Sequence, residues 1–278
     1  MKPTSFPPPH KFEKLNLYYR GPTPIIDIIL SAKNLENLKK SISQISKPDR
    51  RRIERKTRLQ SECSSWFIYR QGCISGTISR QVVNCIKCDT FSIPLNKAIS
   101  KTGQRPFSNE ACRYGLENEK QGIEPLWNQF KKSHRFPKLQ KSGIRTDKDL
   151  AYLVGSPDII LSCENCCCDG VRYFVGEVKC PFRLKESGIQ NWKTLEYLTS
   201  DSELKKTHQH YYQLTLYCGI VGAYIGYFMI WAPDGNIILK VTFDKDLFDH
   251  IKFCSDKYYY EHYIKWLRNV PETSLQTQ

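Results

Sequence analysis

The sequence predicts an α/β protein in which a mixed central β-sheet is flanked by helices and preceded by a helical, basic N-terminal extension. Two apolar segments on either side of Asp169-Gly170 form one predicted β-hairpin. The segments 223–231 and 236–243 form a second hairpin around Pro233-Asp234-Gly235. A helical segment follows each hairpin, the last one from Leu247 to Leu267. Strands that alternate with helices in this way are typical of an α/β core.

Basic residues are concentrated near the N-terminus. The 278 residues include 42 Lys and Arg and 28 Asp and Glu, for a net charge of +14. Residues 1–60 hold 14 of the basic and 5 of the acidic side chains, a surplus of 9, which leaves +5 for the rest. Such an arm favours a polyanionic partner, nucleic acid before a membrane surface. We therefore expect a proline-rich and basic extension (1–60), a core domain (61–268) and a polar tail (269–278).

The sequence also bears on location and on the state of the cysteines. The N-terminal segment lacks the apolar run of a secretion signal, and the apolar run 220–231 is too short to cross a bilayer. We expect an intracellular protein with no membrane partner, nuclear if the host is eukaryotic and otherwise cytoplasmic. Twelve cysteines in such a protein favour free thiols or a metal site over disulfides.

Two short helices are predicted within the extension. Four apolar residues recur at helical spacing between 35 and 45, and Pro48 suits the first turn of a second helix. That second helix carries a basic run from 50 to 58, which is a solvated face, a nuclear-import signal or a DNA contact. The proline-rich residues 1–24 are expected to be poorly ordered.

A candidate phosphate site follows the extension. Trp66 and Arg70 lie one helical turn apart, Gly72 ends that helix, and Ser75 or Thr77 can cap the next one. An arginine that faces a helix N-terminus binds phosphate, because the free N–H groups and the guanidinium both attract the anion. The alternative is ordinary helix capping beside an exposed arginine.

A longer helix is expected to begin at about Asn109, after the loop-like segment 90–108. An apolar stripe along this helix contains Leu116 and also Glu119. A carboxylate in an apolar stripe needs a partner, which makes Glu119 a candidate functional residue. Pro125 should kink or end the helix just beyond it.

The segment 155–181 carries the strongest candidate for catalysis. Glu177 and Lys179 are two positions apart on a predicted strand, so both side chains point to the same face. The hairpin brings Asp158 of the preceding strand beside them. Two carboxylates close together are costly unless a cation is present, and Mg²⁺ is a suitable cation for oxygen ligands near a phosphate. The alternative is a surface ion pair of Glu177 with Lys179 and a turn role for Asp158.

Four cysteines form a candidate zinc site. Cys163 and Cys166 have the spacing of a zinc knuckle near the tip of the first hairpin, and Cys85 and Cys88 repeat it. Four thiolates would leave no open position on the metal, so this zinc ion would brace the hairpin rather than catalyse. Free thiols are the alternative.

The motif Pro157-Asp158 with Glu177-Val178-Lys179 resembles the PD-(D/E)XK nuclease signature. The longer motifs Gly-Ser-Pro-Asp and Glu-Val-Lys-Cys-Pro resemble those of the lambda exonuclease or YqaJ-type viral recombinase family of that superfamily. The resemblance implies a restriction-endonuclease-like core and makes residues 61–268 the nuclease domain. It spans roughly residues 60–265, and its motifs occur in the order of the family.

The resemblance also implies roles for single residues. The family pattern W-x3-R-x-G-x-I-T-A-S is matched from Trp66 to Thr77, which implies that Arg70, Ser75 and Thr77 bind the 5′-phosphate end of DNA. The family G-x3-E pattern implies that Glu119 joins Asp158 and Glu177 at the metal.

A further family pattern, Y-x-Q-x-Q, is matched by Tyr211 and Gln213 in a predicted helix, with Thr215 in place of the second glutamine. This match implies that Gln213 helps to position water or phosphate. From the residues alone, Gln213 is an exposed helical side chain.

The family implies a metal-dependent deoxyribonuclease that uses Mg²⁺ or Mn²⁺ and degrades linear double-stranded DNA from 5′ to 3′ in recombination or end processing. It further implies a homotrimer and a single-strand-annealing protein as partner. Two other functions are open from the sequence. One is a structure-selective endonuclease with the same Asp158, Glu177 and Lys179. The other is a non-catalytic DNA-binding or zinc-braced protein that keeps the fold.

Overall fold

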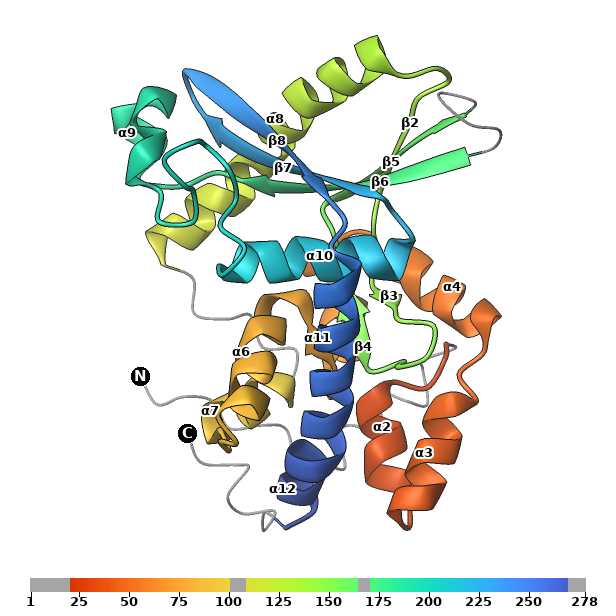
Figure 1. Cartoon of the computed structure of the whole chain (residues 1–278). Coiled ribbons are helices and arrows are strands. Elements are labelled where there is room, and N and C mark those ends of the chain that lie inside the picture. Colours follow the sequence, from red (N-terminus) through yellow and green to blue (C-terminus); the bar gives the residue numbers. More distant parts are fainter. Residues whose placement is uncertain (1–20, 101–108, 165–170, 270–278) are drawn as a thin grey trace.

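The computed structural model describes residues 21–100, 109–164 and 171–269 (Figure 1). Several sequence predictions concern residues outside these ranges: the order of the first 20 residues, the Asp169-Gly170 turn, the zinc ligand Cys166 and the tail beyond residue 269. Among the described helices, none combines the length and the apolar character needed to cross a membrane.

A five-stranded mixed sheet forms the centre of the protein, in the order β2-β5-β6-β7-β8. Neighbouring strands are antiparallel except β6 and β7, which are parallel. Both predicted hairpins are confirmed, as β5 with β6 and β7 with β8. The strands are β2 (Lys138–Lys141), β5 (Ile159–Glu164), β6 (Val171–Lys179), β7 (Ile225–Ala232) and β8 (Gly235–Thr242).

One helix covers each face of this sheet: α8 (Glu110–Ser133) lies on one face and α10 (Gln209–Val221) on the other (Figure 1). Alternate residues of β6 therefore enter two different cores. Phe174 and Val178 pack with Leu126 of α8, whereas Val175 packs with Leu214 of α10. This alternation places Glu177 and Lys179 on the α10 face, as the sequence predicts.

A helical layer lies below α10 around a second, three-stranded sheet with the order β1-β4-β3 (Figure 1). The strands of this sheet are β1 (Ile74–Ser75), β3 (Arg145–Thr146) and β4 (Leu153–Gly155). The helices of this layer are α2 (Ile25–Ser31), α3 (Leu35–Ser43), α4 (Lys47–Lys56), α5 (Ser64–Arg70), α6 (Gly76–Lys87), α7 (Ile93–Ile99), α11 (Lys245–Tyr258) and α12 (Ile264–Asn269). Single turns complete the described chain: η1 (Gln60–Glu62), α9 (Leu184–Ser187), η2 (Ile189–Thr194) and the π-helical η3 (Tyr259–Tyr263).

The helices of the predicted extension share a hydrophobic core with the rest of the protein. Ile26, Ile42 and Ile53 belong to the same buried cluster as Tyr152 and Ile251. A buried contact also joins α4 to β3, since the backbone N–H of Ile144 donates to the Thr57 hydroxyl at 2.7 Å. A domain boundary at residue 60 stays a prediction, although packing continues across that position.

The structure corrects the prediction of a loop from 90 to 108. Residues 93–99 form α7, which the Ser92 side chain caps by accepting a hydrogen bond from the Leu95 N–H at 3.2 Å. Pro94 occupies the first turn, where its missing N–H costs nothing. Leu95 and Ile99 are buried, so packing onto the helical layer holds a helix that is too short to be stable alone.

The long helix differs from the sequence prediction in two ways: it does not end at Pro125, and the predicted stripe is not its buried face. Helix α8 continues through Pro125 to Ser133, and its buried face is formed by Gly122, Leu126 and Phe130 rather than by the predicted stripe. Leu116 of that stripe is 58% exposed. Gly122 allows α8 to lie directly against the Val178 side chain, and this packing on both sides of the proline outweighs the lost backbone hydrogen bond.

Candidate active site

The β5–β6 hairpin brings Asp158, Glu177 and Lys179 together. Ile159 is paired with Gly176, so Asp158 stands opposite Glu177 at the next step of the antiparallel register. The Asp158 Oδ2 accepts a hydrogen bond from the backbone N–H of Val178 at 2.6 Å. On the α10 face, Lys179 Nζ donates to Glu177 Oε1 at 2.6 Å. The Glu177 side chain is only 4% exposed, so the surface ion pair considered from the sequence is excluded.

Gln213 joins this group from α10, which covers this face of the sheet (Figure 1). It is a buried residue on α10, not the exposed helical side chain that the residues alone allowed. Its amide Nε2 donates to Glu177 Oε1 at 2.7 Å and to the Tyr217 hydroxyl at 3.0 Å. Gln213 therefore fixes one oxygen of Glu177, together with Lys179, and leaves the other oxygen free.

The carboxyl groups of the site repel one another. Burial, followed by the nearby charges of Glu177 and Glu119, raises the pKa of Asp158 well above its usual value. Burial and Glu177 likewise raise the pKa of Glu119, which projects from α8. Burial alone would lower the pKa of Lys179, but Glu177 and Asp158 outweigh it and raise that pKa. One ammonium group thus balances three clustered carboxyl groups only in part, and an added cation would complete the balance.

The oxygens of this site fit a divalent cation. Glu177 Oε2 is buried and has no hydrogen-bond partner in the described part of the chain, a costly arrangement unless a ligand completes it. Within the described residues, no three His, Cys, Asp or Glu side chains form a metal-binding group by themselves. Asp158 and Glu177 are adjacent, and Glu119 lies within electrostatic range of both. Mg²⁺ commonly takes one or two carboxylates, with water and phosphate oxygens as its other ligands, so the donor set is adequate.

Glu119→Gln is expected to raise the melting temperature of the metal-free protein. The pKa of Glu119 is raised on folding, so the stability linked to this group is present at low pH and is lost as the pH rises through that pKa. The increase in melting temperature should therefore be larger near pH 8 than near pH 5. It should amount to about 2–4 °C for each ~1 kcal/mol of repulsion that is removed. Calorimetry in the presence of a chelator measures this gain.

Glu117→Gln is the matched control for this experiment, because Glu117 is exposed on the same helix and should leave the melting temperature unchanged. Saturating Mg²⁺ should reduce the gain, since the cation neutralises the same carboxylates. A Glu119→Gln protein that melts below the wild type near pH 8 would contradict the electrostatic account.

The predicted phosphate site contains an arginine without a counter-ion. Arg70 ends α5 and stacks on the Trp66 ring, with its guanidinium carbon 4.0 Å from the ring centroid. Among the described residues, its guanidinium makes no salt bridge and donates no hydrogen bond. Burial lowers the pKa of Arg70, and no carboxylate is close enough to oppose this effect. A partly buried cation in this state is a ready partner for an anion.

Ser75 and Thr77 flank the start of α6. Gly72 turns the chain with φ +73°, in the left-handed region that favours glycine, and leads through β1 to α6. Ser75 occupies the N-cap position, but its side chain does not cap the helix and instead lies 2.9 Å from the Thr77 hydroxyl. Among the described residues no side chain caps the first-turn N–H groups of this 12-residue helix, and one of the two hydroxyl groups keeps its hydrogen free for an anion.

Residues near Lys179 that the sequence analysis missed are His210 and Tyr217, with His208 beside His210. Burial, then the charges of Lys179 and His208, lowers the pKa of His210 to about 3, so this ring is neutral at physiological pH. Tyr217 lies one turn after Gln213 on α10 and accepts its hydrogen bond. The i, i+4 spacing of Gln213 and Tyr217 was the only sequence signal for this contact.

The described cysteines of the predicted zinc site lie apart. Cys163 is buried in the core between α8 and the sheet. Cys85 packs against the separate helical core below α10, and Cys88 is exposed at the end of α6. Cys166 lies outside the described residues. The structure therefore does not bring Cys85 and Cys163 together, and zinc binding stays an untested prediction.

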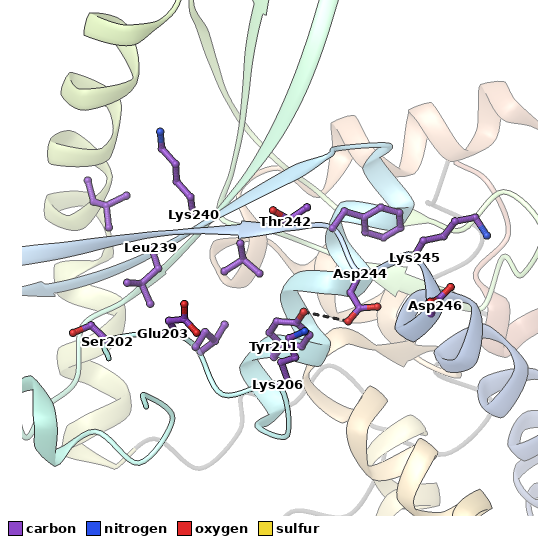
Figure 2. A pocket seen from close by; sticks show the side chains of 14 residues that line it. Ser202, Glu203, Lys206, Tyr211, Leu239, Lys240, Thr242, Asp244, Lys245 and Asp246 are labelled. Carbon is purple, nitrogen blue, oxygen red and sulfur yellow. Dashed lines mark hydrogen bonds between the residues drawn. The ribbon is translucent and has the colours of Figure 1, made fainter. Parts of the chain in front are cut away.

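A groove of about 770 Å³ lies elsewhere, along β8 and the segment around residue 203 (Figure 2). Tyr211 lines this groove and donates a hydrogen bond to Asp244 Oδ2 at 3.2 Å. None of the three clustered carboxyl groups lines it, and neither does Lys179. The groove is therefore separate from the Asp158, Glu177 and Lys179 site.

Comparison with known proteins finds likeness in structure only. No protein-family model matches the sequence, and no curated protein matches it. An alkaline exonuclease from Laribacter hongkongensis, in complex with dAMP, superposes with a TM-score of 0.52 at 16% identity, over 74% of this chain and 96% of that chain. The Shutoff and Exonuclease Protein (SOX) of Kaposi's sarcoma-associated herpesvirus gives 0.52 at 12% identity, over 85% and 78%.

A complex of SOX with DNA gives a TM-score of 0.51 at 15% identity, over 87% of this chain and 79% of that one. In these three comparisons the likeness covers 74–87% of this chain. At these identities it establishes the fold alone. The chain thus has the α/β fold of these exonucleases, which confirms the fold that the sequence predicts.

Proposed function

We propose that this protein is a metal-dependent deoxyribonuclease that degrades linear double-stranded DNA from the 5′ end, in recombination or end processing. The observation that carries the proposal is the cluster of Asp158, Glu177 and Lys179 on one hairpin, with a buried and unpartnered oxygen on Glu177. Solved nucleases of the same fold, one of them bound to dAMP, support this assignment.

Each residue of the cluster has a distinct role in this proposal. Asp158 and Glu177 would hold Mg²⁺ or Mn²⁺, and Glu119 would add charge or a ligand. The bound ion would supply Lewis acidity and a lowered pKa for water. The Lys179 ammonium orients the attacking water and stabilises the negative charge that develops on the phosphate. Gln213 holds Glu177 in one rotamer, so that its free oxygen faces the metal position.

Preference for an exonuclease over an endonuclease rests on Arg70. The Arg70 guanidinium has no carboxylate partner among the described residues and lies within electrostatic range of Tyr217, whose ring packs on Gly76 in the first turn of α6. Together with the N–H groups of that turn and the Thr77 hydroxyl, such a cation suits a terminal 5′-phosphate with its extra negative charge. Ser75 would contribute through its hydroxyl. An endonuclease does not need such a site, because it cuts away from the ends of the strand.

The proposal is tested with three substrates: linear duplex with a 5′-phosphate, the same duplex with a 5′-hydroxyl, and covalently closed circles. With Mg²⁺ we expect rapid loss of the first, slower loss of the second and survival of the circles. Arg70→Ala should remove the preference for the phosphate, which corresponds to roughly 1.5–3 kcal/mol, yet leave slow cleavage of linear DNA.

Arg268→Ala is the matched control, because Arg268 is exposed on α12 and, among the described residues, donates to the backbone of Ala32. Circles that are nicked as readily as linear DNA is shortened would favour the structure-selective endonuclease. Absence of any cleavage would favour a non-catalytic DNA-binding protein. Single-stranded RNA belongs among the substrates, because SOX has also been solved with RNA.

The other implied properties stay predictions with direct tests. Light scattering on the purified protein would reveal a homotrimer. Co-purification with a single-strand-annealing protein encoded by the same genome would test that partner. Metal analysis of protein prepared without added metal would find about one zinc ion per chain if the cysteines bind it.

A further inference from the structure

Tyr217 lies between the two halves of the proposed site. The residue is 4% exposed, and one edge of its ring packs against two glycines that are far apart in the sequence but lie side by side after β1 and at the end of β4. A Cβ atom on Gly76 would lie 2.6 Å from the ring atom Cε1, and one on Gly155 would lie 2.6 Å from Cδ1. Both separations are too short for any side chain. The two glycines therefore form a slot that the tyrosine ring fills.

Each glycine belongs to a segment with a proposed role. Gly76 stands between Ser75 and Thr77, at the first turn of α6 where the 5′-phosphate would bind. Gly155 ends β4 and precedes Asp158 by three residues. The Tyr217 ring thus touches the segment that receives the DNA end and the segment that carries a catalytic carboxylate.

The Tyr217 hydroxyl extends this contact to Glu177. It accepts a hydrogen bond from Gln213 Nε2 at 3.0 Å, and the same nitrogen donates to Glu177 Oε1 at 2.7 Å. An amide nitrogen carries two hydrogens, so these two bonds use both of them and fix the orientation of the Gln213 amide. Burial raises the pKa of Tyr217, which keeps the hydroxyl protonated throughout the physiological range.

We infer that Tyr217 is a positioning residue that couples the 5′ end of the DNA to the cleavage site. This inference rests on the proposed function. Phosphate bound between Arg70 and Thr77 holds the first turn of α6 against the ring. The ring then holds the Gln213 amide, and the amide holds Glu177 with its free oxygen toward the metal position. Without the phosphate the first turn of α6 is less constrained, and the amide can leave this orientation.

Tyr217→Phe tests the inference, because phenylalanine keeps the ring in its slot and removes only the hydroxyl. Single-turnover rates are measured with Mg²⁺ on linear duplexes that end in a 5′-phosphate or a 5′-hydroxyl. Binding of the same duplexes is measured by fluorescence anisotropy with Ca²⁺. We expect the ratio of the two cleavage rates to fall about tenfold, the effect of one lost hydrogen bond. The binding preference for the phosphate should stay, because Arg70 is intact.

Tyr258→Phe is the matched control. Tyr258 is a fully buried tyrosine whose hydroxyl likewise bonds a side-chain amide, but as a donor: it donates to Asn96 Oδ1 at 2.9 Å, away from the site. This variant should lose stability. It should keep both the wild-type ratio of the two cleavage rates and the wild-type binding preference for the 5′-phosphate. A purely structural effect of Tyr217→Phe would resemble the control.

Two results would overturn the coupling. One is a wild-type cleavage ratio in Tyr217→Phe. The other is an equal loss of rate on both duplexes, which would mean that Tyr217 supports Gln213 regardless of the DNA end. If the wild-type protein cleaves the 5′-phosphate and 5′-hydroxyl duplexes at the same rate, end recognition by Arg70 is refuted, and the coupling with it. The failures are distinguishable, because this last one appears in the unmodified protein.

Discussion

Glu177→Gln is expected to abolish DNA cleavage while the protein stays folded. The substitution keeps the shape of the side chain but removes the charge at Glu177 Oε2, a buried oxygen that has no hydrogen-bond partner among the described residues. It also leaves Lys179 without its 2.6 Å carboxylate contact. Losses of this kind of electrostatic stabilisation cost on the order of 10²–10³ in rate, or more. Single-turnover cleavage of linear duplex with Mg²⁺ measures the loss, and Asp158→Ala and Lys179→Ala should behave alike.

Thermal unfolding provides the companion measurement. A Glu177→Gln protein that melts near the wild-type temperature and does not cut DNA supports a catalytic role. Glu186→Gln, a change at an exposed glutamate of α9, should alter neither quantity. Cleavage within a few fold of wild type in the Glu177 variant would refute the assignment of the site, whereas loss of the fold would point to a structural role.

Gly143→Ala is expected to be among the most destabilising single changes in the protein. A Cβ atom at this position would overlap the Glu54 carbonyl oxygen and the Thr57 hydroxyl of α4. The overlap with backbone cannot be relieved by a rotamer change, so α4 must move away from β3. We expect a loss of at least about 3 kcal/mol, or about 6–12 °C in melting temperature.

Gly115→Ala provides the comparison for this second prediction. Gly115 lies in α8, where the nearest atom to an added Cβ would be the Cys180 carbonyl oxygen at 3.9 Å. Alanine should therefore fit there and gain helix propensity. If Gly143→Ala melts like Gly115→Ala, the helices before residue 60 are not an integral part of the core.

The sequence could predict the parts of the fold and site that depend on local pattern. The alternation along β6, the turn at Pro233-Asp234-Gly235 and the i, i+2 spacing of Glu177 and Lys179 are properties of short segments. The structure confirms both hairpins and the shared face of these two residues. Their catalytic and metal-binding roles, and those of Arg70 and Gln213, stay predictions.

Features that depend on packing between distant segments could not be predicted. Helix α7 exists because Leu95 and Ile99 are buried against residues from elsewhere in the chain. Helix α8 survives Pro125 because Gly122 and Leu126 pack on the sheet. The Tyr217 slot is formed by glycines at 76 and 155, and neither has a local pattern that refers to the other. Contacts between residues this far apart in the sequence can be identified only once the fold is known.

The turn at Gly72 has a consequence for the order in which the protein is made. Its carbonyl oxygen accepts a hydrogen bond at 2.7 Å from Tyr259, which lies 187 residues later in the π-helical turn after α11. At typical rates of translation, roughly 10–40 s pass between the two residues. The β5–β6 hairpin, which carries the carboxylates, is synthesised during that interval. The arginine that would recognise a DNA end lacks the support of its turn until the C-terminal tyrosines have emerged.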